Sequence, residues 1–420
     1  MPVSSIARKS PLISPFKKLA VSNLAAHMSD QIALIAIPLV AVTALDAGGG
    51  ATSIIQMLNT LPYLLLAVPF GLLVDRGRRR GIMTAGELVR TLTILVLIVL
   101  AFTDAVSLTA LTALGVAGSI GTVAYSVAVP NAVRDLVPPD SLARSNGQIE
   151  LARSIATTAG PALAGALVGY VGSNAAFGIA ASLSILAVVN LASLPRDTRT
   201  QRASTKSPLK DIIEGARFVS GHEVLRPIVI TAILFNTGWF CLQGVYVAYA
   251  MTRLDMTSGQ TGLTLTLYGV GMVVGSRLAG VLAGRVWFGR LVVIGPICGA
   301  LASTLMIASL VWPTWLLPSL AWLLLGSGPM IWTISTTTLR QMITPPDMLG
   351  RVSALLVTST AGFRPVGAGL GAVSYLLGGY EAVLTVSWVA FLAQAAVIIR
   401  SRAARVTDIP ALETPQVAVN

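Results

Sequence analysis

The segment Gly71–Arg80, GLLVDRGRRR, decides how this chain folds. It places one aspartate and four arginines between two long apolar runs, in a chain of 420 residues of which only 11% are charged. A short and strongly basic connection between two apolar helices is retained on the cytoplasmic side of a membrane. The segment therefore indicates a membrane-spanning helical hairpin whose turn faces the cytoplasm.

The composition of the whole chain agrees with a membrane protein. Hydrophobic residues make up 54% of the chain and the mean hydropathy is +0.79, whereas an ordinary soluble domain is about one quarter charged. The net charge is +12, but the basic residues cluster in the short connections between apolar runs. We therefore expect no nucleic-acid partner, and we predict an all-α integral membrane protein.

Twelve transmembrane helices are predicted, because a spanning helix needs roughly 20 apolar residues. They lie at residues 18–45, 52–75, 80–102, 106–131, 142–170, 173–194, 224–251, 258–284, 289–311, 314–339, 349–377 and 379–401. Lys and Arg concentrate in alternate connections, which places both termini in the cytoplasm. The expected location is the cell (inner) membrane, with multiple passes.

A polar segment at the midpoint separates two sets of six helices. It begins with a basic stretch and continues as an amphipathic pattern over Leu209–Val219, which indicates a helix on the membrane surface. We predict an N-terminal six-helix bundle over 1–194, a cytoplasmic linker with an amphipathic helix over 195–222, a C-terminal six-helix bundle over 223–401 and a cytoplasmic tail over 402–420.

An internal repeat supports this division. The sequence VPPDSLARS at Val137–Ser145 recurs as TPPDMLGRV at Thr344–Val352, and GLLVDR at Gly71–Arg76 is echoed by GVLAGR at Gly280–Arg285. The echo carries a glycine where the first copy carries its aspartate. Two repeats in a membrane chain indicate a transporter built from two pseudo-symmetric halves.

With these features the chain resembles the major facilitator superfamily. GLLVDRGRRR is similar to the loop signature of that superfamily, although its glycine directly follows the first arginine. SDQIALIAIPL at Ser29–Leu39 and GPALAGALVG at Gly160–Gly169 are similar to bacterial exporters of the macrolide and enterobactin type. The resemblance implies the major facilitator fold, with two pseudo-symmetric six-helix bundles, and it implies export. The predicted fourth span lacks the Arg-x-x-x-Gly-type motif of many proton antiporters.

The resemblance also assigns roles to residues of this chain. It implies a gating motif at Gly71, Asp75, Arg76, Arg79 and Arg80, and an antiporter-type motif at Gly160, Pro161 and Gly165. A simple topology anchor with solvated charges is the alternative interpretation of the gating motif.

The first predicted span carries an acid within the membrane. Asp30 follows Lys18 by 12 residues, which puts it roughly 18 Å deep, near the midplane. Asn23, His27 and Asp30 share one helical face. An acid in hydrocarbon faces a cavity or a partner, so Asp30 is a candidate for proton coupling or substrate binding. A fixed ion pair within the N-terminal half is the alternative.

Other polar side chains on the predicted spans are candidates for a site. Glu150 is a second proton-coupling candidate, although Arg153 lies three residues away and can pair with it. We interpret Glu87 and Arg90, at the same spacing, as structural, because their span is peripheral in the resembled fold. Aromatic side chains beside amides suit an amphipathic ligand, with ordinary packing as the alternative. The substrate-binding candidates are His27, Gln56, Asn59, Tyr63, Tyr125, Arg153, Asn236, Trp239, Gln243, Trp332 and Arg364.

The sequence contains no phosphate-binding loop and no cluster of Cys and His. We therefore expect no enzyme activity, metal or cofactor, and a proton gradient as the energy source. The leading hypothesis is a monomeric secondary transporter, in contact with membrane lipid, that exports a hydrophobic or amphipathic small molecule by alternating access and proton-coupled antiport. The alternatives are an exporter of a siderophore or lipid-like molecule, and a non-transporting membrane sensor or scaffold.

Overall fold

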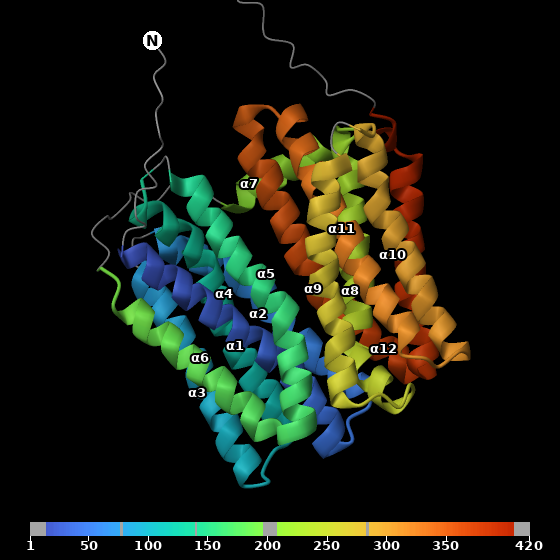
Figure 1. Cartoon of the computed structure of the whole chain (residues 1–420). Coiled ribbons are helices and arrows are strands. Elements are labelled where there is room, and N and C mark those ends of the chain that lie inside the picture. The colour runs from blue at the N-terminus through green and yellow to red at the C-terminus, as the bar shows by residue number, and fades with distance from the viewer. Residues whose placement is uncertain (1–13, 76–78, 139–140, 196–207, 283–284, 407–420) are drawn as a thin grey trace, which may run out of the picture.

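The computed structural model describes residues 14–75, 79–138, 141–195, 208–282 and 285–406, and these residues form helices without any β-strand. The α-helices are α1 (Ser14–Leu45), α2 (Gly49–Asp75), α3 (Arg79–Phe102), α4 (Leu108–Leu136), α5 (Leu142–Ala166), α6 (Ser173–Ala192), α7 (Pro208–Gly221), α8 (Leu225–Thr252), α9 (Ser258–Leu282), α10 (Phe288–Val311), α11 (Leu316–Ile343) and α12 (Pro346–Arg400). Helices α1–α6 pack together on one side of the molecule and α8–α12 on the other (Figure 1).

The longest helix, α12, contains two membrane spans. It has 55 residues, and a straight helix of that length measures about 80 Å, whereas the hydrocarbon core of a bilayer is about 30 Å thick. The backbone leaves the helical conformation at Gly378 and Gly379, and the φ of Gly379 is +62°, in the left-handed region that favours glycine.

Eleven of the described helices are long and apolar enough to cross a membrane. Ten of them cross once and α12 crosses twice, so the described residues make twelve crossings, as the sequence predicts. The last two crossings are joined by the Gly378–Gly379 break alone. The exception among the α-helices is α7, which is short and amphipathic.

The linker helix α7 is attached to the start of α12. Arg351 Nε lies 3.0 Å from the carboxylate of Glu214. Gly215 of α7 lies so close to α12 that an added Cβ would stand 2.5 Å from the backbone oxygen of Arg351. The chain that joins the two sets of helices therefore packs on the C-terminal set.

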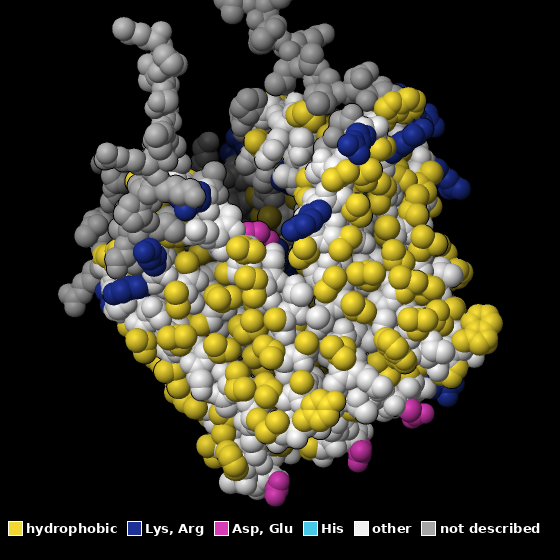
Figure 2. Space-filling model, in the orientation of Figure 1, with side chains coloured by type: hydrophobic (Ala, Val, Ile, Leu, Met, Phe, Trp, Pro, Cys, Tyr) yellow, Lys and Arg dark blue, Asp and Glu magenta, His cyan; other side chains and the backbone are white. Residues whose placement is uncertain are grey.

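The two ends of the bundle differ in charge (Figure 2). We call one the basic end; its described residues include Lys17, Lys18, Arg79, Arg80, Arg134, Arg144, Arg285, Arg290, Arg340, Arg351, Arg400, Arg402 and Arg405. We call the other the acidic end; it carries Asp46, Asp104, Asp255 and Glu381, with Arg253 paired to Glu381 at 3.2 Å. This asymmetry is the one expected for a chain inserted in a single orientation.

The two halves meet closely toward the acidic end. An added Cβ on Gly165 of α5 would stand 2.5 Å from the backbone oxygen of Ser258 and 2.8 Å from the Cα of Gly262 on α9. Tyr375 of α12 packs on the glycine run Gly48–Gly50 at the start of α2, where an added Cβ on any of the three glycines would stand 2.9 Å or less from the tyrosine ring or its hydroxyl. Small residues of this kind allow helix backbones to approach. Toward the basic end the halves separate around a hollow lined by charged side chains (Figure 2).

The close contact between α5 and α9 generates a prediction. Gly165→Ala places a methyl group against backbone atoms of α9, and overpacking of this kind costs about 1–3 kcal/mol. We expect a lower free energy of unfolding for this variant, measured by denaturant titration of the purified protein in micelles.

The matched control is Gly178→Ala on α6, where an added Cβ meets no atom within 4 Å. Because alanine favours a helix over glycine by about 1 kcal/mol, this variant is expected to be as stable as the parent or more so. Equal stability of the two variants would show that the α5–α9 contact yields to a methyl group.

Candidate functional site

A central cavity of about 440 Å³ lies between the two halves. Its walls combine charged, amide and aromatic side chains from α1–α5, α8, α9 and α12. The structure places nine of the predicted site residues in this lining: Asp30, Gln56, Asn59, Tyr63, Arg153, Asn236, Trp239, Gln243 and Arg364. The cavity therefore joins positions that the sequence separates by more than 300 residues.

A second cavity of about 470 Å³ adjoins the first. All of its lining except Arg153 comes from the C-terminal set of helices, so we call it the C-terminal cavity. The predicted residue Trp332 lies here rather than in the central cavity. The two cavities share five lining residues: Arg153, Phe235, Asn236, Tyr268 and Arg364.

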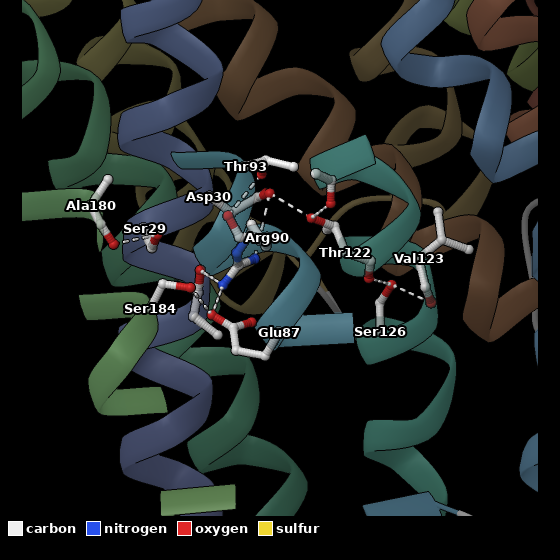
Figure 3. Close-up of polar contacts among 12 residues, drawn as sticks. Ser29, Asp30, Glu87, Arg90, Thr93, Thr122, Val123, Ser126, Ala180 and Ser184 are labelled. Atoms are coloured by element: carbon white, nitrogen blue, oxygen red, sulfur yellow. Dashed lines mark hydrogen bonds and ion pairs between the residues drawn. The ribbon is translucent and has the colours of Figure 1, made fainter. Parts of the chain in front are cut away.

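Asp30 is the exposed end of a chain of charges (Figure 3). Thr122 donates a hydrogen bond of 2.8 Å to its carboxylate, and Arg90 Nη1 lies 3.6 Å away. Arg90 Nη2 donates to Glu87 at 2.5 Å and to the carbonyl of Ala26 at 2.7 Å. The side chains of Arg90 and Glu87 are buried, whereas that of Asp30 is 25% exposed.

The charges of this network do not balance. Two carboxylates, Asp30 and Glu87, share the single guanidinium of Arg90, so the group as a whole carries one negative charge when both acids are ionised. The stronger contact goes to buried Glu87, which also accepts a hydrogen bond of 2.6 Å from Ser184. Asp30 is left with the longer contact and with access to the cavity, so a proton or a cation reaching the network from the cavity meets Asp30 first.

The sequence did not predict that Arg90 belongs to the site. The Glu87–Arg90 pair was expected to be structural, and the pair is formed, but Arg90 also faces Asp30 and lines the central cavity. The i, i+3 spacing already supplies Arg90 with a partner, so nothing in the pattern of α3 indicates a second one. An ion pair within the N-terminal half and a position facing the cavity were predicted as alternatives for Asp30. In the structure Asp30 has both, since it pairs with Arg90 and lines the central cavity.

Glu150 and Arg153 form the predicted pair on α5. Arg153 Nε donates to Glu150 at 2.9 Å, and both side chains are exposed, at 54% for Glu150 and 42% for Arg153. Arg153 lines both cavities, whereas Glu150 lines neither of them. The role of Glu150 in proton coupling remains a prediction.

His27 and Tyr125 lie outside the lining of both cavities. Their rings are in edge-to-face contact at 6.3 Å, and the Tyr125 hydroxyl accepts a hydrogen bond of 3.4 Å from Asn23. Tyr125 is fully buried. The structure thus places these two substrate-binding candidates one turn from Asp30 toward the basic end, where they pack within the N-terminal half.

Aromatic packing and cavity lining coincide at Trp239. Its ring stacks on Phe235 at 5.8 Å and lies 4.7 Å from that of Tyr268, and all three side chains line the central cavity. Gln56 donates to Gln243 at 3.4 Å across the two halves. The aromatic surface is therefore rigid and flanked by amides, an arrangement suited to an amphipathic molecule.

Arg364 of α12 lacks a counter-ion. Its guanidinium lies 5.3 Å from the ring of Tyr63 and 5.6 Å from that of Phe240. Within the described part of the chain no carboxylate lies within 4 Å of it, and its Nε is buried without a hydrogen-bond partner. Cation–π contacts offset only part of the cost of such burial.

The gating motif is partly described. Arg79 forms an ion pair with Asp135 at the end of α4, and Arg80 donates to the carbonyl of Ala192 at the end of α6. An added Cβ on Gly71 would lie 3.9 Å from Val127, in ordinary contact. Arg76 and the side chain of Asp75 lie outside the described residues. A role of this motif in gating remains a prediction.

The antiporter-type motif supplies close packing. An added Cβ on Gly160 would stand 2.5 Å from the Cβ of Gln31 on α1. The carbonyl oxygen of Pro161 lies 2.5 Å from the position of a Cβ on Gly262, so α9 of the other half approaches the backbone of the motif. Pro161 and Gly165 form the contact of α5 with α9, whereas Gly160 packs on α1.

Two helical halves around a polar cavity, with twelve membrane crossings, define a membrane transporter. The chain belongs to the Major Facilitator Superfamily, whose family model matches residues 19–368. Members of this family are transporters and not enzymes. Among the residues that the structure describes, no three His, Cys, Asp or Glu side chains form a group able to hold a metal ion.

Several characterised and uncharacterised transporters are similar in sequence. The chain is 30% identical to an uncharacterized MFS-type transporter, y4rN, of Sinorhizobium fredii over 61% of this chain and 62% of that protein. It is 27% identical to the enterobactin exporter EntS of Citrobacter koseri (64% and 60%) and 23% identical to macrolide efflux protein A of Streptococcus pyogenes (54% and 57%). The chain thus matches about three fifths of the length of these curated relatives.

Solved structures share the fold at lower identity. A bacterial homologue of the iron transporter ferroportin in an inward-facing state has a TM-score of 0.73 at 17% identity, over 94% of this chain and 99% of that one. The nucleoside transporter NupG has a TM-score of 0.72 at 11% identity, over 92% and 98%. The outward-facing state of the ferroportin homologue has a lower TM-score of 0.58 at 16% identity, over 91% and 98%.

The buried charge network generates a second prediction. Arg90→Gln leaves Glu87 buried without a counter-ion, and breaking a buried pair in this way costs about 3–5 kcal/mol. We expect a large fall in the free energy of unfolding, measured by denaturant titration in micelles.

Arg153→Gln is the matched control, because it removes an arginine from an i, i+3 pair that is exposed. Such pairs contribute at most about 1 kcal/mol. Equal losses for the two variants would contradict the view that Glu87 depends on Arg90.

Proposed function

We propose that this protein exports an amphipathic small molecule across the cell membrane by alternating access, in exchange for protons. The observation that carries the proposal is the central cavity, which combines the accessible acid Asp30 with a rigid aromatic and amide surface, at the contact between the halves. A scaffold or sensor needs no such cavity, whereas a transporter needs one at this place.

The charge of the two ends supports the side of the membrane to which the cavity is open. The positive-inside rule assigns the basic end, and with it both termini, to the cytoplasm. The halves are packed together toward the acidic end and separated toward the basic end (Figure 2). In this orientation the cavity is open to the cytoplasm, which is the state in which an exporter takes up its substrate.

The Asp30 network supports coupling to protons. The excess negative charge shared by Asp30, Arg90 and Glu87 is neutralised when Asp30 accepts one proton. Asp30 is the member of the network that faces the cavity, so it exchanges protons with the side to which the cavity is open. In the proposed mechanism the charge of Asp30 then depends on the side of the membrane to which the cavity is open, as antiport by alternating access requires.

The relatives support an organic substrate. Two of them are named exporters of a macrolide and of enterobactin, and both cavities here adjoin, so they accommodate a molecule larger than either cavity alone. We expect a drug or a secondary metabolite, including siderophores and lipid-like molecules. The cavity walls come entirely from one chain, so a monomer in the lipid bilayer suffices.

The experiment uses inverted membrane vesicles that contain the full chain, energised to an acidic interior. We expect uptake of a macrolide or of enterobactin that stops when a protonophore is added. Asp30→Asn is expected to reduce uptake to the level seen with the protonophore while substrate binding is retained, because the network can no longer take up a proton at this position.

Asp104→Asn is the control, since this acid lies at the acidic end, away from both cavities. Full protonophore-sensitive uptake by Asp30→Asn would remove Asp30 from the mechanism. If the unmodified chain accumulates none of a broad panel of drugs and siderophores, export itself is refuted.

A further inference from the structure

We propose that the C-terminal cavity binds the acidic group of the exported molecule, so that the substrate is an amphipathic organic anion. The inference rests on the proposed export function and makes its substrate class specific. The relevant features are the charges of the cavity, its unpaired hydrogen-bond donors and its position beside the aromatic surface.

The charges that line the C-terminal cavity are all positive. Three arginines line it, Arg153 from α5, Arg340 from α11 and Arg364 from α12, and its lining contains no Asp or Glu. Asp30, the acid of the central cavity, is absent from this lining. The lining of the central cavity combines the carboxylate of Asp30 with three arginines, Arg90, Arg153 and Arg364, whereas the lining of the C-terminal cavity carries arginines without any acid.

Two of these arginines lack a counter-ion. Arg153 pairs with Glu150, but within the described residues neither Arg340 nor Arg364 has a carboxylate within 4 Å. Both are partly buried. Arg364 lies within a membrane-crossing helix, where a cation is costly and is normally paired, whereas Arg340 lies in the last turn of α11, at the basic end. An anionic group of a bound substrate would provide the missing charge.

The unpaired polar atoms of this cavity can all donate hydrogen bonds. Five buried side-chain atoms in its lining have no hydrogen-bond partner: Thr231 Oγ1, Trp332 Nε1, Arg340 Nε, Arg364 Nε and Gln394 Nε2. Four of them are N–H donors and the fifth is a hydroxyl. Buried donors without partners are rare in proteins. Arg340 and Arg364 carry two of these atoms, and their guanidinium groups suit a ligand rich in acceptor oxygens, such as a carboxylate, a sulfonate, a phosphate or a catecholate.

The aromatic surface accommodates the remainder of the molecule. Phe235 and Tyr268 line both cavities, and Trp239 packs against them on the central side. Arg364 also lines both cavities. An aromatic or apolar body on this surface brings an attached acidic group within reach of Arg364 at the junction of the two cavities.

The test is a binding measurement with two probes of the same shape. The purified full chain is placed in nanodiscs of phosphatidylcholine, and the binding of radiolabelled 1-naphthylacetate is compared with that of 1-naphthylacetamide. We expect the carboxylate to bind about tenfold more tightly or better, because hydrogen bonds from arginine to a carboxylate are stronger than those to a neutral amide.

Arg364→Gln is expected to remove the preference for the carboxylate while the amide binds as before, and Arg340→Gln is expected to reduce the preference. Arg364→Lys retains the positive charge and should keep part of the preference for the carboxylate. The control is Arg277→Gln, which removes an exposed arginine of α9 that lines neither cavity and should leave the preference unchanged.

Three outcomes overturn the inference. The two probes bind the unmodified chain equally; the preference for the carboxylate survives in both Arg364→Gln and Arg340→Gln; or the folded variants lose binding of the two probes to the same extent. A further arm replaces part of the lipid with phosphatidylglycerol. If phosphatidylglycerol weakens the binding of naphthylacetate to the unmodified chain but not to Arg364→Gln, the anion site is supported and is assigned to a lipid headgroup. If phosphatidylglycerol leaves the binding to the unmodified chain unchanged, the anion site is supported and is assigned to a soluble anion.

This test and the export test fail separately. The binding measurement uses no gradient, so a chain that prefers naphthylacetate but accumulates nothing in vesicles retains the anion site and loses the export function. A chain that exports a neutral or cationic drug and shows no preference between the probes retains export and loses the anion site.

Discussion

Hydrocarbon offers no counter-ion, so the few charges within this bilayer-spanning chain are arranged by the need for partners. Arg90 stands at the centre of this arrangement in the N-terminal half, because its single positive charge serves Glu87 in the protein interior and Asp30 at the cavity wall. The imbalance is tolerated because Asp30 retains contact with the cavity. The ion pair with buried Glu87 thereby positions the guanidinium of Arg90, and the contact with Arg90 positions the carboxylate of Asp30 at the cavity wall.

The C-terminal half shows the opposite imbalance. Arg340 and Arg364 line its cavity without a carboxylate, next to donors that also lack partners. A negative network and a positive cavity thus adjoin across the contact between the halves, with the rings of Phe235 and Tyr268 where the two spaces meet. The amphipathic anion proposed above spans both spaces, with its aromatic or apolar body between them and its acidic group beside the arginines of the C-terminal cavity.

The helices were predictable, because apolar runs are local signals, and even the break at Gly378 separates the last two predicted spans. The clusters of arginine likewise predicted that one end of the bundle is basic. Nine residues of the central cavity lining were predicted, because polar and aromatic residues on apolar helices are a local signal, as at Asp30 and Arg364. Arg90 was missed because its sequence neighbour Glu87 explains it sufficiently. The unpaired donors at Trp332 and Gln394 have no sequence signal, since the lack of a partner is a property of the packed structure.

The contact between the halves at the acidic end contains no ion pair among the described residues, since Arg253 pairs with Glu381 of its own half. Its contacts are neutral: backbone surfaces at Gly165 and Gly262, the ring of Tyr375 on the run of glycines, and Tyr380 in contact and hydrogen-bonded with the backbone at Gly49. With the acidic end outside the cell, as proposed, this seam faces a medium whose ionic strength and acidity vary. Van der Waals contacts are not screened by salt and do not titrate. In the proposed orientation, the contact that closes the cavity to the exterior is therefore insensitive to external salt and acidity, and the proposed proton coupling is confined to the cavity.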